Sequence, residues 1–187
     1  MKNWTNLTRV TSSPTPLLDL DTTKAFLRAP DDDDDLITGL IEAATAHIEG
    51  PSGIGRALLT SKWRQSFDAL PSTFSIALSP VQTVDQITVL TDQGLVDVDL
   101  STVHVDVDQH PAMIAFTAPR PTPSSLPGSV KVTFTAGYGD KPSSVPADLR
   151  HAALWLVANW HENRGDDASK TAIPVTVDRV LNKYRMF

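Results

Sequence analysis

Clustered carboxylates are the side chains of this 187-residue sequence that could do chemistry. Five aspartates run from Asp31 to Asp35, and two alternating pairs follow, Asp97 with Asp99 and Asp106 with Asp108. Clustered oxygens suit Ca²⁺ or Mg²⁺, and paired carboxylates suit acid–base catalysis. The run lacks the alternate ligand spacing and turn glycine of a calcium loop, and the valines between the paired aspartates are typical of half-exposed strands. We therefore expect an acidic first helical turn and solvated strand faces, with no metal site.

The sequence offers no other catalytic pattern. It contains no cysteine, which excludes disulfides, thiolate metal sites and a cysteine nucleophile. No two of its five histidines are spaced i, i+4 as in a zinc helix, and no serine lies in a Gly-x-Ser-x-Gly turn. The segment Gly53-Ile-Gly-Arg56 lacks the remaining residues of a dinucleotide or phosphate loop. We predict that the protein is not an enzyme, has no catalytic residues and uses no cofactor.

Composition further limits the class of protein to which this chain can belong. Hydrophobic residues make up 41% and charged residues 20% of the chain, which is ordinary for a globular protein and argues against general disorder. The net charge of −6 argues against a general nucleic-acid binder, because phosphate binding needs a basic face, so any DNA the protein meets should slide past it. No apolar run is long enough for a membrane span or a signal peptide, and we expect an intracellular protein at synthesis.

Hydrophobic spacing predicts an α+β fold. Apolar residues at helical spacing predict helices at residues 21–28, 33–49 and 147–164, with Asp21 as the first N-cap. Period-two alternation predicts a small antiparallel β module at residues 57–135, inserted between the N-terminal helices and the C-terminal helix of a bundle. We expect one domain at residues 17–165, flanked by extended termini at residues 1–16 and 166–187.

The last predicted helix is apolar nearly all round. Leu149, Ala152 and Leu156 form one stripe, while other apolar side chains cover most of the remaining surface. A soluble helix with that pattern is buried on more than one side, and we expect one side to meet another subunit. The candidate interface residues are Leu154, Trp155 and Trp160.

The C-terminal segment is predicted not to order alone. Each large apolar side chain would gain about 1.5 to 3 kcal/mol on burial, whereas fixing each backbone residue costs about 1 to 2 kcal/mol. A partner could reverse this balance by adding main-chain pairing or many simultaneous contacts. The candidate binding residues are Ile173, Val175, Val177, Tyr184, Arg185, Met186 and Phe187.

A series of short phrases, in order, resembles the head-tail connector (adaptor) proteins of long-tailed bacteriophages, a family also found in gene transfer agents and prophages. The resemblance covers roughly Leu20 to Gly165. The phrases are Phe26-Leu-Arg28, the Asp-rich turn, Leu36-Ile37 with Leu40-Ile-Glu-Ala-Ala44 and His47-Ile-Glu49, Gly55-Arg-Ala-Leu-Leu-Thr-Ser-Lys-Trp63, Pro80-Val-Gln-Thr-Val84 with Ile87, Val132-Thr-Phe-Thr-Ala-Gly-Tyr-Gly139, Val145-Pro146 with Leu149-Arg150, and Glu162-Asn-Arg164. Each phrase alone is weak, but their order and spacing together are specific.

This resemblance implies a structural virion protein, assembled in the bacterial host cytoplasm and located at the head–tail interface. Such subunits form a ring, commonly a dodecamer, beneath the portal protein, and they meet a stopper or tail-terminator ring while DNA passes through the lumen without specific binding. No membrane is involved. The alternative is a stopper or another tail-completion protein. Assigning residues 173–187 to portal binding rests on their composition and position.

Overall fold

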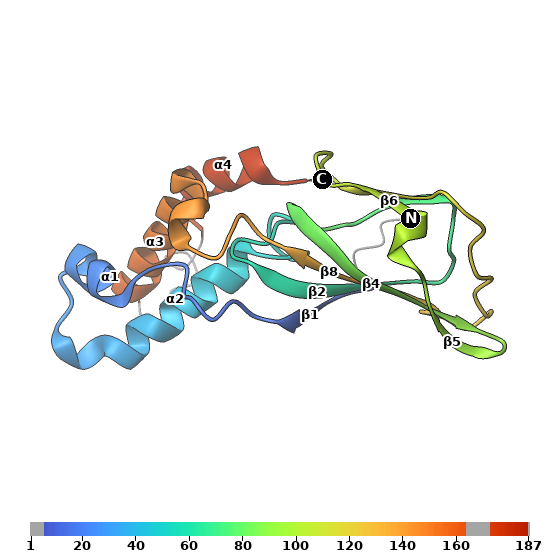
Figure 1. Cartoon of the computed structure of the whole chain (residues 1–187). Helices are drawn as coiled ribbons and strands as arrows, with labels where there is room; N and C mark the ends of the chain where they lie inside the picture. The colour runs from blue at the N-terminus through green and yellow to red at the C-terminus, as the bar shows by residue number, and fades with distance from the viewer. Residues whose placement is uncertain (1–5, 164–172, 187) are drawn as a thin grey trace. The chain divides into compact units, whose positions relative to one another are not determined.

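The computed structural model describes residues 6–163 and 173–186. The chain folds as two compact units. We call Met1–Ser12 with Thr60–Gly137 the β unit, and Ser13–Leu59 with Tyr138–Phe187 the helical unit. The fold contains both helices and antiparallel sheets, which confirms the α+β prediction (Figure 1).

The β unit is built on a five-stranded antiparallel sheet. In spatial order its strands are β1 (Leu7–Thr11), β2 (Ser61–Phe67), β8 (Val130–Ala136), β4 (Val81–Thr91) and β5 (Gly94–Asp97). Side chains of β2 and β8 alternate between buried and more exposed positions, as their sequence period of two predicts. Trp63 of β2 lies opposite Phe134 of β8, and both are buried, so this pair anchors the sheet.

A second, three-stranded antiparallel sheet completes the β unit. Its strands, in spatial order, are β3 (Thr73–Ser75), β7 (Met113–Phe116) and β6 (Val103–Asp106). A short 3₁₀ helix, η3 (Leu100–Thr102), precedes β6. The rings of Phe67 and Phe74 meet edge to face with centroids 5.0 Å apart, so an aromatic contact joins β2 to β3.

Among its described residues, the helical unit has four α-helices, which Figure 1 labels. They are α1 (Leu20–Leu27), α2 (Asp34–Ile48), α3 (Ala147–Glu162) and α4 (Val175–Tyr184), with 3₁₀ turns η2 (Asp31–Asp33) before α2 and η4 (Pro142–Ser144) before α3. Helix α2 packs against α3, and α3 packs against α4. The buried side of α2 carries Ile37, Ile41, Ala44 and Ile48, whose spacing places them on one face.

The N-cap of α1 differs from the sequence prediction. Asp19, not Asp21, caps the helix, and its carboxylate accepts a hydrogen bond of 2.9 Å from the Thr22 backbone N–H. Asp21 lies in the first turn, where its negative charge interacts favourably with the helix dipole. The sequence offered two aspartates two residues apart, and the cap geometry selects the one outside the first turn.

The terminal segments are also more structured than the sequence suggested. Residues Leu7–Thr11 of the expected N-terminal arm form β1 and pair with β2. The prediction that the C-terminal segment stays unordered alone is wrong for Val175–Tyr184, which form α4. Val177 and Leu181, one helical turn apart, are 0% and 2% exposed within the core of the helical unit. Burial against the chain's own helices therefore supplies the stabilisation of this segment that we expected from a partner.

Candidate assembly surfaces

Helix α3 divides the three predicted interface residues between two environments. Its buried stripe consists of Leu149, Ala152, Ala153, Leu156 and Val157. Trp160 packs partly buried against this core, and its ring meets the His47 ring edge to face at a centroid distance of 5.9 Å. Leu154 is half-buried and Trp155 is 38% exposed, so Trp155 is the most exposed of the three predicted interface residues.

Trp155 lines a surface hollow of the helical unit whose residues are far apart in the sequence. A hollow of about 390 Å³ is lined by Phe26, Leu27, Trp155, Ala158, Asn159, Glu162 and Pro174. Phe26 of α1 is 47% exposed, and Val175, next to Pro174, is 67% exposed. We call Phe26, Trp155, Pro174 and Val175 the outer patch. Its members come from three helices and their flanks, so sequence distance hid the grouping.

Polar contacts hold the end of the C-terminal segment, Tyr184 and Met186, against the rest of the helical unit. The Tyr184 hydroxyl donates a 2.6 Å hydrogen bond to Oδ1 of Asp148 on α3, and Nε of Arg56 donates a 2.7 Å bond to the Tyr184 carbonyl. The Met186 backbone N–H donates to the Ile54 carbonyl at 3.2 Å. The bond to Asp148, together with burial, raises the pKa of Tyr184 to about 12. Tyr184 is therefore neutral and able to donate at physiological pH.

These contacts divide the predicted tail-binding residues into buried and exposed ones. Val177 is buried and Tyr184 is engaged with Asp148, while Ile173 and Met186 are half-buried. Val175 and Arg185 are exposed. Phe187 lies outside the described residues. With α4 docked as described, a partner can reach Val175 and Arg185 without displacing the helix.

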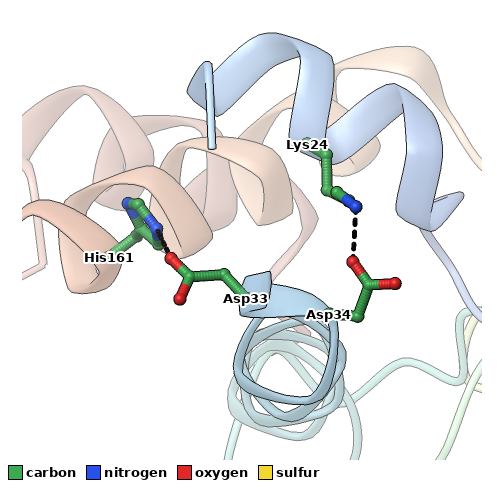
Figure 2. A network of polar contacts seen from close by, with 4 residues as sticks. All are labelled: Lys24, Asp33, Asp34 and His161. Carbon is green, nitrogen blue, oxygen red and sulfur yellow. Dashed lines mark hydrogen bonds and ion pairs between the residues drawn. The ribbon is translucent and has the colours of Figure 1, made fainter. Parts of the chain in front are cut away.

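The aspartate run serves to join helices. Asp34 begins α2 and forms an ion pair with Lys24 of α1 (Figure 2). Asp33 lies 3.4 Å from Nε2 of His161 on α3 (Figure 2). Asp34 and Asp35 occupy the first turn of α2, where the helix dipole favours their charge. Two of the aspartates thus link the start of α2 to both neighbouring helices.

The alternating carboxylates of the β unit have separate local roles. Asp97 accepts bonds of 3.0 Å from the side chains of Gln86 and Thr88. Asp99 caps η3, and the backbone N–H of Ser101 lowers the pKa of its carboxyl. Asp106 accepts bonds from its near neighbours at residues 108 and 109. Residues 6–163 and 173–186 contain no group of three or more His, Cys, Asp or Glu side chains that could hold a metal ion.

No helix within the described part of the chain is both long and apolar enough to cross a membrane.

The comparisons with known proteins identify the family. The model described as "HCP: Head completion protein" matches residues 17–187, and the chain belongs to this family. This confirms the resemblance to head-tail connectors and gives the chain a structural role in head completion. No curated protein matches the chain.

Solved structures of gene transfer agent (GTA) particles contain similar chains. One, from "Neck of empty GTA particle computed with C6 symmetry", has a TM-score of 0.80 at 26% identity. A second, from "Virion of native gene transfer agent (GTA) particle", has a TM-score of 0.78 at 26% identity. A third, from "Neck of native GTA particle computed with C12 symmetry", has a TM-score of 0.70 at 25% identity. Each match covers 96% of this chain and 94% of the other.

Proposed function

We propose that this protein is an adaptor subunit at the head–tail interface of a virion, where a ring of copies joins the portal to the stopper or tail. The observation that carries the proposal is the match, over 96% of this chain, to chains of GTA necks. The role is mechanical rather than catalytic, in keeping with a family described by head completion.

A ring of twelve copies is the proposed assembly. One matched neck was computed with twelvefold symmetry and another with sixfold symmetry, and both are compatible with twelve subunits around one axis. A closed ring requires heterologous contacts, in which two different surfaces of each subunit meet. Trp155 and Leu154 supply one such surface, supported from the core side by Trp160. The net charge of −6 suits a channel through which DNA slides without being held.

Portal binding is assigned to the C-terminal segment. In the docked state Val175 and Arg185 are the exposed members of the proposed set, so they provide the first contacts. Val177 and Tyr184 would become available only if α4 left the helical unit. Portal engagement is therefore proposed to begin on α4 as it lies, through Val175 and Arg185.

A stopper or another tail-completion component is the second candidate, because the description "head completion" fits either position. Deleting the gene from a particle-producing strain and imaging the particles distinguishes the two. For an adaptor, filled or leaking heads without tails should carry a bare portal. For a stopper, the tailless heads should retain a ring on the portal. Normal tailed particles would contradict both roles.

A further inference from the structure

Exposed apolar side chains mark two places on this molecule. Eight large apolar side chains of the described residues are exposed, and five of them form two groups. One group is Phe26, Trp155 and Val175 of the outer patch. The other is Leu95 and Val96 of the β4–β5 hairpin, 71% and 40% exposed (Figure 1). Grouped exposure of this kind marks a contact surface more strongly than scattered single residues do.

Two exposed arginines lie close in the chain to members of the outer patch, and we call Arg28 and Arg179 its basic rim. Arg28 follows Phe26 by two residues and is exposed at the end of α1. Arg179 is exposed one helical turn after Val175, and residues at that spacing share one face of a helix. Neither arginine has an ion pair with another described residue. Glu162, which lines the hollow, is the acidic group there.

The tip of the hairpin has the opposite character. Strand β4 turns through Asp92 and Gln93 into β5, and Leu95 faces solvent two residues after the turn. Asp92 and Asp97 are exposed on either side of Leu95 and Val96. Gly94 has a φ of 121°, which a glycine adopts without strain, so the tip holds a tight turn that presents an apolar side chain between two carboxylates.

We propose that the β4–β5 hairpin of one copy lays Leu95 into the outer patch of the next copy, with Asp92 facing Arg179. This inference rests on the proposed ring and names both sides of its subunit contact. The two surfaces differ, as a heterologous contact requires. The hollow of about 390 Å³ has room for a leucine side chain. The acidic tip and the basic rim complement each other, which fixes orientation and excludes wrong partners.

The remaining exposed apolar residues fit the patch less well. Val10 adjoins Arg9, whose charge would face the basic rim. Leu126 lies among uncharged residues and brings no complementary charge. Leu36 does have aspartates beside it, but it is only 40% exposed and Asp34 is already paired with Lys24. Leu36 and Leu126 therefore serve as matched controls.

Thiol cross-linking tests the contact directly because the chain has no cysteine of its own. Rings would be assembled with the portal protein from the variant L95C/V175C, treated with a short bismaleimide and separated on a denaturing gel. Both positions are more than two-thirds exposed, so the fold should tolerate the changes. We expect a ladder of covalent multimers from L95C/V175C and only dimers or monomers from either single variant. A ladder from L36C/V175C or L126C/V175C instead would overturn the inference.

A charge exchange gives an independent readout. The variants D92R and R179D should each lower the association constant of one contact by about fivefold, the upper range for an exposed ion pair. The double variant should recover ring yield, and D108R, an exposed aspartate elsewhere in the β unit, should assemble normally. Failure of the double variant to recover would contradict the pairing.

Failure of this inference and failure of the proposed function are distinguishable. Parent rings that form on the portal without an L95C/V175C ladder would overturn the hairpin contact and leave the adaptor role standing. Absence of any ring from the cysteine-free parent would overturn the adaptor role, and the hairpin contact with it.

Discussion

The hydrogen bond between Tyr184 and Asp148 gives a sharp test of how the C-terminal tail is held. It joins α4 to α3 at 2.6 Å, and its acceptor is an oxygen of the Asp148 side chain. Such bonds contribute about 1.5 to 3 kcal/mol when buried, and because Tyr184 is partly exposed we expect about 1 to 2 kcal/mol. The variant Y184F should lower the urea midpoint correspondingly with an unchanged denaturant slope. An unchanged midpoint would refute the tail's anchoring.

The same bond makes stability depend on alkaline pH. The folded-state pKa of Tyr184 is raised to about 12, above the value of about 10 for an unfolded tyrosine. The bond's contribution is therefore fully present below pH of about 10 and is lost as the pH rises toward about 12, because a phenolate cannot donate and repels Asp148. Y184F should remove this part of the pH dependence.

Phenolate absorbance measures this pKa directly. The chain has two tyrosines, and burial also raises the pKa of the other, Tyr138, so the variant Y138F isolates Tyr184. At pH 11 a free tyrosine would be about 90% ionised and a group with a pKa of 12 about 10%. Circular dichroism at the same pH checks that the protein is folded. Nearly complete ionisation of the folded variant at pH 11 would contradict the bond.

Two further pairs of substitutions test the packing, each with a control, by urea unfolding. Leu181→Ala should lower the free energy of unfolding by about 2 to 5 kcal/mol because Leu181 is 2% exposed in the core. Its control V175A, at a site 67% exposed, should change the free energy of unfolding by less than about 0.5 kcal/mol. Equal effects of the two variants would refute the docking of α4. Gly53→Ala should cost at least about 2 kcal/mol because its Cβ would lie 2.0 Å from the Ile48 carbonyl oxygen. Gly39→Ala, in open space on α2, should stabilise by about 0.5 to 1 kcal/mol, and the reverse order would contradict the turn geometry.

Local periodicity predicted much of the fold. The spacing of Ile37, Ile41 and Ile48 defines the buried face of α2, and the alternation around Trp63 defines β2. Both signals arise within one element, where side-chain geometry fixes the period. The α+β class followed from such patterns, but strand β1 and helix α4 did not.

Non-local contacts account for what the sequence did not show. Strand β1 has little apolar alternation, so its own sequence gives a weak signal. It is held by pairing with β2, about fifty residues later. Helix α4 orders through Val177 and Leu181, whose burial depends on helices distant in the chain. The outer patch joins Phe26 of α1 to Trp155 of α3, so no window of sequence contains both. Grouping these two side chains therefore requires the three-dimensional structure.

Cryo-electron microscopy of the chain assembled with its portal protein tests the central claim most directly. The account predicts a closed ring of twelve copies seated beneath the portal, with Trp155 and Leu154 at the contact between neighbouring subunits. A chain that remains monomeric beside the portal, or that binds only below a separate ring already on the portal, would contradict the adaptor role.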